Sequence, residues 1–141
     1  MFDTIGGLPV HPLVVHAAVV LIPLSAIGVV LIVLRPRLLR FFGPATVIGA
    51  FIGLIAAFIA KQSGESMATR VGNPEPHVEY GDIYPIAALG YFIVLTIFWL
   101  FARGVPLNRA RPLWLKALGA VVLLAAIGIS YFTFLTGHSG A

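Results

Sequence analysis

Four long apolar runs constrain the fold of this chain more than any other feature. They extend over residues 13–34, 41–60, 83–102 and 117–135, and none contains an acidic or a basic side chain. A bilayer core about 30 Å thick requires about 20 apolar residues in helical form. Lipid offers no partner to backbone polar groups, so each run must pair its own N–H and C=O groups as an α-helix does. The sequence therefore predicts an all-α integral membrane four-helix bundle that forms a single domain over residues 1–141.

The composition excludes several other classes of protein. The chain is 60% hydrophobic and only 10% charged, whereas about a quarter of the residues of a soluble domain are charged. The net charge of +4 does not indicate nucleic-acid binding, because the basic residues fall in short clusters between the apolar runs, as topology signals do. The chain has no cysteine, which excludes disulfides and thiolate metal sites.

Proline and charged residues mark the predicted helix ends. Arg35-Pro36-Arg37 should end the first helix, because the residue before a proline avoids the helical region. Four other prolines are expected in the first turn of a helix: Pro12, Pro44, Pro85 and Pro112. Pro23 lies inside the first run and should kink it. Residues 62–82 are expected to form a long loop, with Lys61 and Glu65 as an exposed pair where the second helix continues into it.

The distribution of charge predicts the orientation in the membrane. Seven of the nine basic residues lie in the two short connections on one side, and they are Arg35, Arg37, Arg40, Arg103, Arg109, Arg111 and Lys116. All five acidic residues belong to the other side, with both termini. Short loops rich in Lys and Arg stay in the cytoplasm. The sequence thus predicts a multi-pass protein of the inner (plasma) membrane with both termini extracytoplasmic. The N-terminal segment lacks the features of a signal peptide and is expected to remain as the first span.

All four histidines are expected at the extracytoplasmic face. His11 and His16 lie at the start of the first helix, His77 in the predicted long loop, and His138 just after the fourth run. Imidazole binds iron, zinc and copper well, so His16, His138, His77 and His11 are the candidate cofactor ligands, the first three also for a bare metal. His16 is the deepest and hence the strongest candidate. His11 and His16 are five residues apart, about 140° around a helix, and should not share one face.

The histidines and one pair of glycines can each be explained by structure alone as well as by a function. A histidine near the membrane surface often only hydrogen-bonds a carbonyl or reaches toward water. The sequence therefore allows haem b, zinc or copper, or no cofactor at all. Gly49 and Gly53 form a small-xxx-small pattern that favours close helix packing, either within the bundle or in a homo-oligomer.

Short motifs at both ends of the chain resemble a known family. These are residues 8–16 (Leu-Pro-Val-His-Pro-Leu-Val-Val-His), the histidine of the expected loop with Gly81 after it, and residues 136–141 (Thr-Gly-His-Ser-Gly-Ala). In this order they resemble the bacterial predicted membrane proteins grouped as domain of unknown function 2231, over essentially the whole chain. The resemblance implies four spans and a distant similarity to small b-type cytochrome bundles. The matching positions are His11, Pro12, His16, His77, Gly137 and His138. Ala17-Ala18 stands where many relatives carry Phe-Pro, which is expected to leave more space beside His16.

These features favour a membrane redox protein that binds b-type haem at the extracytoplasmic end of the bundle. It would pass electrons between the quinone pool and an extracytoplasmic partner, as an electron carrier rather than an enzyme with its own substrate. The alternative is a non-catalytic accessory subunit or a histidine-based zinc or copper binder. Transport ranks last, because no carboxylate lies within a span.

Overall fold

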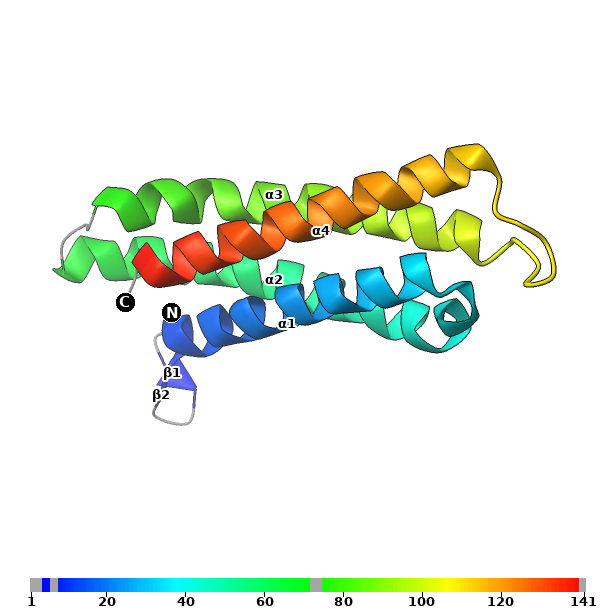
Figure 1. The fold of residues 1–141 in the computed structure, drawn as a ribbon. Coiled ribbons are helices and arrows are strands. Elements are labelled where there is room, and N and C mark those ends of the chain that lie inside the picture. Colours follow the sequence, from blue (N-terminus) through cyan, green and yellow to red (C-terminus); the bar gives the residue numbers. More distant parts are fainter. Residues whose placement is uncertain (1–3, 6–7, 72–74, 140–141) are drawn as a thin grey trace.

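A computed structural model shows four long helices that lie together as one bundle (Figure 1). It describes the backbone of residues 4–5, 8–71 and 75–139, and the side chains of residues 11–65 and 81–137. The helices are α1 (Val10–Leu34), α2 (Leu39–Val71), α3 (Glu75–Ala102) and α4 (Leu113–Ser139). A 3₁₀ turn, η1 (Pro36–Leu38), joins α1 to α2, and two-residue strands β1 (Thr4–Ile5) and β2 (Leu8–Pro9) pair ahead of α1. The predicted all-α four-helix fold is confirmed.

The helices form a ring in chain order, in which α1 and α3 each pack against both α2 and α4. The start of α1, the end of α2, the start of α3 and the end of α4 lie at one end of the bundle (Figure 1). We call it the histidine end, because all four histidines lie on the helix segments there. The opposite end carries residues 35–40 and 103–116, and we call it the arginine end.

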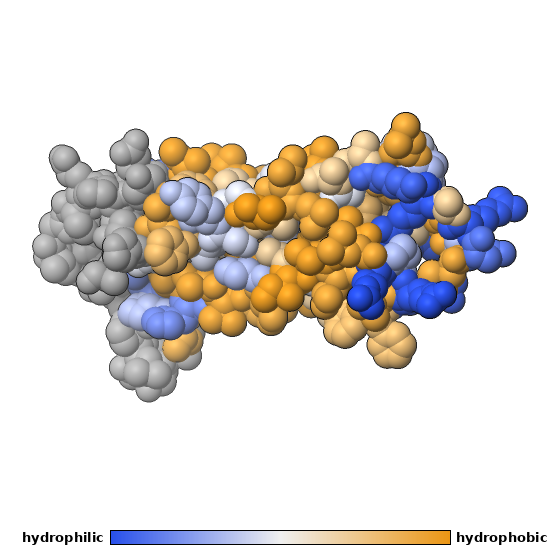
Figure 2. All heavy atoms as spheres, viewed as in Figure 1, coloured by the Kyte–Doolittle hydropathy of each residue, from blue (hydrophilic) through white to orange (hydrophobic). Residues whose placement is uncertain are grey.

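Each helix is long and apolar enough to cross a membrane. The spans that meet these criteria are His11–Leu34, Pro36–Glu65, Gly81–Ala102 and Leu113–Gly137. Large apolar side chains on the outside of the bundle remain exposed, among them Ile27, Ile86 and Leu124. Figure 2 shows them as a broad hydrophobic belt, with hydrophilic side chains gathered at the arginine end. A water-soluble protein rarely exposes so large an apolar surface, so this belt is suited to lipid.

The interior of the bundle is filled by side chains. Phe98, Leu95, Ile22 and Val122 are almost completely buried. No buried side-chain nitrogen or oxygen within residues 11–65 and 81–137 lacks a hydrogen-bond partner. Such satisfaction is required where no water can take the place of a missing partner.

Two hydroxyl pairs tie the helices together inside this core. Ser25 Oγ donates to the Ile22 carbonyl at 2.7 Å, so it accepts from the Tyr91 hydroxyl 3.0 Å away. Thr133 Oγ1 likewise donates to its own helix and accepts from the Tyr84 hydroxyl at 2.8 Å. The first pair links α1 to α3 across the bundle, and the second links α3 to α4. Together they fix the rotation of α3 relative to its neighbours.

The Gly49–Gly53 pattern packs within the bundle. A Cβ atom at Gly53 would lie 2.7 Å from Ile22 Cγ1, and one at Gly49 would lie 4.0 Å from Ser25 Cβ. Both glycines thus face α1, and they let the two backbones approach closely, as small residues do in membrane helix pairs. Of the two predicted uses of this pattern, the structure shows the one inside the bundle. A homo-oligomer through these glycines stays a prediction.

The predicted loop over residues 62–82 is wrong, because α2 continues to Val71 and α3 begins at Glu75. The absence of a long apolar run there did not preclude helix, since polar residues continue a helix well once it has formed. Pro85 accordingly lies inside α3 instead of opening it. The missing N–H is tolerated because the rest of the segment still pairs its backbone as a helix. Pro23 lies inside α1 as predicted.

Candidate haem or metal site at the histidine end

His16 is held in a defined orientation on α1. Its Nδ1 lies 2.6 Å from the carbonyl oxygen of Pro12, one turn earlier. A carbonyl can only accept a hydrogen bond, so Nδ1 must carry the proton. In the neutral ring the lone pair is then on Nε2, the tautomer that binds metals when a carbonyl orients the opposite nitrogen. The sequence thus places a pre-oriented imidazole about 9 Å into the helix from Val10.

The His16 side chain faces outward from the bundle. It is exposed, and so are Leu13 and Val20, three residues before and four after it, at 49% and 59%. This spacing puts all three on one face of α1. Ala17 and Ala18 pack toward the core. These two small residues therefore serve the packing of α1, and the space beside His16 is on the outer surface.

His11 lies at the contact between α1 and α2. Its Nδ1 is 3.1 Å from the Ala60 carbonyl and 3.0 Å from Ser63 Oγ. Its ring lies against Gly64, where an added Cβ would be 3.1 Å from the His11 Cε1 atom. This histidine ties the start of α1 to α2. The prediction that His11 and His16 face different directions is confirmed.

The other two histidines lie on the same end of the bundle. The backbone of His77 belongs to α3 and not to a loop, and that of His138 belongs to the last turn of α4. The side chains of both are outside the described residues, so their predicted roles as ligands stay predictions. Among the side chains of residues 11–65 and 81–137, no three histidines or carboxylates are grouped so that they could hold a metal ion.

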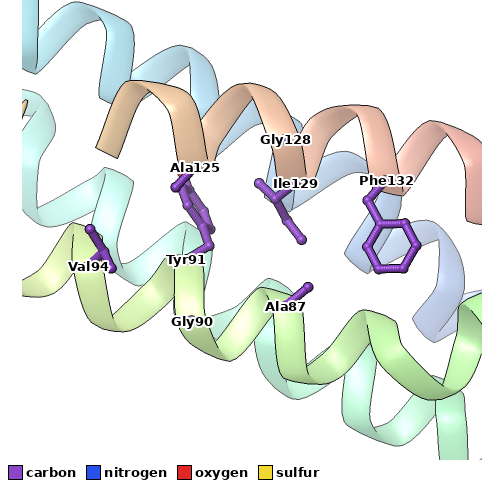
Figure 3. Close-up of a pocket in the computed structure, with 8 residues that line it drawn as sticks. All are labelled: Ala87, Gly90, Tyr91, Val94, Ala125, Gly128, Ile129 and Phe132. Carbon is purple, nitrogen blue, oxygen red and sulfur yellow. The ribbon is translucent and has the colours of Figure 1, made fainter. Parts of the chain in front are cut away.

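A haem bound through His16 would have to lie on the outer face of the bundle and not inside it, because the ring is exposed. The interior beside α1 is filled, and His16 does not point into it. A groove of about 310 Å³ lies between α3 and α4, and its lining includes Gly90 of α3 and Gly128 of α4 (Figure 3). Its lining is apolar, and no histidine belongs to it. The exposed surface around His16, by contrast, carries one imidazole among apolar neighbours, and an imidazole is a common axial ligand of haem iron.

Sequence reasoning missed several contacts that shape the two ends. Lys61 Nζ pairs with Asp82 Oδ1 of α3 at 3.2 Å, so the predicted partner Glu65 is wrong. Arg111 reaches from the α3–α4 connection to the end of α1, where it donates to the Val33 and Ile32 carbonyls at 3.0 Å each. Both partners are far away in sequence. One signal for the Arg111 contact was available in the sequence. The last carbonyls of a helix have no partner within the helix, so a donor from elsewhere is expected there.

The apolar belt, the four spanning helices and the confinement of charge to the two ends define a multi-pass integral membrane protein. The chain belongs to the family described as Predicted membrane protein (DUF2231), whose model matches residues 7–141. The resemblance noted from its histidine motifs is thereby confirmed. No curated protein and no solved structure matches the chain.

Proposed function

We propose that this protein binds haem b at its histidine end with His16 as an axial ligand, and that it carries electrons in the membrane. The observation that carries the proposal is the hydrogen bond from His16 Nδ1 to the Pro12 carbonyl at 2.6 Å. This bond fixes the tautomer and aims Nε2 outward. A haem iron needs only one or two protein ligands, whereas zinc is usually held by three or four. A single outward imidazole therefore meets the needs of haem more readily.

Each residue of the site has a limited task. His16 provides the ligand nitrogen, and the Pro12 carbonyl orients the ring as an outer-shell partner does. Leu13 and Val20 offer apolar surface on the same face. Haem, when bound, supplies one-electron chemistry at its iron. His138 and His77, whose backbones lie at the same end, are the proposed sources of a second ligand.

The arginine end is proposed to face the cytoplasm. Seven of nine basic residues lie there, and short loops rich in Lys and Arg remain inside. Both termini and the haem site would then be extracytoplasmic, in reach of the quinone pool and of an extracytoplasmic redox partner. A C-terminal alkaline phosphatase fusion in a bacterial host should be active, and the matching green fluorescent protein fusion dark. The reverse pattern would place the site in the cytoplasm.

The test of haem binding is a reduced-minus-oxidised absorption spectrum of the chain, expressed with added haem and purified in mild detergent. We expect the sharp alpha band of a b-type cytochrome, and its loss or strong weakening in His16→Ala. His11→Asn is the matched control, because the amide nitrogen can replace Nδ1 as donor to the Ala60 carbonyl. A spectrum without haem bands in the wild-type chain would contradict the proposal.

The use of His11 in helix packing favours a second candidate, a non-catalytic accessory subunit or a zinc or copper binder. If the histidines serve mainly to stabilise the helix packing at this end, His16 would contact a protein partner or bind a zinc or copper ion instead of haem. Metal analysis of the colourless protein separates these outcomes. Stoichiometric zinc or copper that disappears in His16→Ala supports the binder, and a metal-free stable complex with other membrane proteins supports the subunit.

A further inference from the structure

A small pocket at the arginine end lies between the two short connections of the chain. Its volume is about 130 Å³. One wall comes from the α1–α2 connection and the start of α2, and includes Arg40. The other wall comes from residues 102–111 and includes Arg103, Arg109 and Arg111. Segments more than 60 positions apart thus bring four arginine residues to the lining of one pocket, at the end where Figure 2 shows the hydrophilic side chains gathered.

No carboxylate among the described side chains forms a salt bridge with these arginines. Residues 35–60 and 83–117 contain no Asp and no Glu. The salt bridge between described residues, Lys61 with Asp82, lies at the opposite end. Guanidinium groups so close together repel one another, and an anion between them removes that repulsion. The charge pattern therefore points to a bound anion.

Two of the arginines make contacts with neighbouring groups, although Arg103 itself is exposed. Arg111 donates to the Ile32 and Val33 carbonyls and lies 5.4 Å from the centre of the Phe98 ring. Arg103 lies 4.9 Å from the centre of the Trp99 ring. Arg40 and Arg109 are exposed at the rim. Arg111 and Arg103 form part of the pocket walls. Arg40 and Arg109 can change rotamer and turn toward a ligand.

The surroundings of the pocket match the surface of a membrane. Apolar residues share its lining, with Leu39 buried at the base and Leu107 half exposed. Phe41, next to Arg40, is 86% exposed, and Leu113, just after Pro112, is 83% exposed. Such apolar side chains beside a basic hollow suit a molecule that is anionic at its head and apolar below it.

We propose that this pocket binds the phosphate group of an anionic phospholipid, with Arg40 and Arg109 as its main ligands. A guanidinium fork matches the geometry of phosphate oxygens and can bind two of them at once. Basic pockets between membrane helices hold phospholipid headgroups by the same chemistry. The acyl chains would lie along the exposed apolar residues of α2 and α4. This site is independent of the haem proposal, since it is at the other end of the bundle.

The test uses native mass spectrometry of the full chain, delipidated in detergent and titrated with phosphatidylglycerol or phosphatidylcholine. We expect phosphatidylglycerol adducts to dominate at equal concentration. The double variant Arg40→Gln, Arg109→Gln should weaken them about tenfold or more, since it removes the charge-assisted hydrogen bonds to the phosphate, and one such bond corresponds to about tenfold in affinity. The double variant Arg35→Gln, Arg37→Gln is the matched control, because it removes the same charge at the same end from residues that do not line the pocket. It should change the adducts less than about twofold.

Two further measurements keep the proposal falsifiable. The double variant Arg40→Lys, Arg109→Lys preserves the charge and the fold but removes the fork, and should bind less well than the wild type. Equal weakening by the pocket variant and the control would show a diffuse charge effect and overturn the proposal, as would equal binding of the two lipids. Displacement of phosphatidylglycerol by millimolar inorganic phosphate would mean that the pocket takes free phosphate, which would overturn the assignment to a lipid.

Discussion

The two ends of the bundle are held together by different means. At the arginine end the connections are short, and Arg111 joins the α3–α4 connection to the end of α1 through two charge-assisted hydrogen bonds. At the histidine end α2 and α3 continue beyond the apolar spans, and the contacts there include the His11 bonds and the Lys61–Asp82 pair.

Because of this difference, we expect the two ends to contribute differently to stability and to ligand binding. The arginine end combines charges of one sign with buried donors, so its contacts are strong and its net field favours anions. The histidine end mixes charges of both signs and leaves an oriented imidazole on its surface. We therefore expect substitutions at the arginine end to affect unfolding most, and His16 at the histidine end to affect ligand binding without much effect on unfolding.

The largest loss of stability is expected for Arg111→Ala. It leaves the Ile32 and Val33 carbonyls without their donor, and it removes the guanidinium from the Phe98 ring. Hydrogen bonds from a charged donor contribute about 1.5–3 kcal/mol each, so we expect a loss of about 3 kcal/mol in unfolding free energy. Titration with sodium dodecyl sulfate in mixed micelles measures it. Arg109→Ala, at an exposed position, should change the same quantity by less than about 0.5 kcal/mol. Equal losses in the two variants would mean that the lost positive charge, and not the hydrogen bonds from Arg111 to the Ile32 and Val33 carbonyls, lowers the unfolding free energy.

The next largest effect is expected for Gly43→Ala, where α2 contacts α3 near the arginine end. An added Cβ would lie 2.5 Å from Trp99 Nε1, so the indole must move. Overpacking of this kind costs about 1–3 kcal/mol, against which alanine gains about 1 kcal/mol in helix propensity. We expect a net loss of up to about 2 kcal/mol in unfolding free energy. At Gly90 an added Cβ meets nothing within 4 Å, so Gly90→Ala should instead stabilise. A stabilised Gly43→Ala would contradict the tight contact.

The fold could be predicted almost entirely from the sequence, because the bilayer allows an uncharged run of 20 residues few alternatives to helix. The ends of α2 and α3 could not, since polar residues such as those after Ala60 read equally well as loop or as helix extending from the membrane. For the candidate site, the grouping of histidines at one end followed from the alternation of spans. The direction of each ring did not, because it depends on how α1 is rotated against α2, which is set by Ile22 against Gly53.

Arginine contacts were unpredictable for a different reason. The positive-inside rule explains why Arg111 is on its side of the membrane, but it says nothing of what the side chain touches. Its partners are backbone carbonyls 78 and 79 positions away. Only packing between the α3–α4 connection and α1 brings them together.

A smaller effect is expected at the histidine end for His11→Ala. It removes the donor to the Ala60 carbonyl and to Ser63, in a partly exposed contact. We expect a loss of about 1 kcal/mol in unfolding free energy, the usual net value of one neutral hydrogen bond. His16→Ala, which removes a bond within its own helix, should cost less. If His16→Ala in the ligand-free protein costs more than His11→Ala, the assignment of His11 to packing and His16 to ligand binding is wrong.

The smallest effect is expected for the Lys61–Asp82 pair. The two side chains are 33% and 52% exposed and 3.2 Å apart, and exposed pairs contribute about 0.2–1 kcal/mol because water and salt screen them. A double-mutant cycle with Lys61→Gln and Asp82→Asn should give a coupling of about 0.5 kcal/mol, reduced further in 0.5 M salt because the screening length falls. A salt-insensitive coupling above about 1.5 kcal/mol would place the pair in a low-dielectric environment. The pair would then stabilise the contact between α2 and α3 at the histidine end as strongly as Arg111 stabilises the arginine end. The two ends would no longer differ in the strength of their contacts.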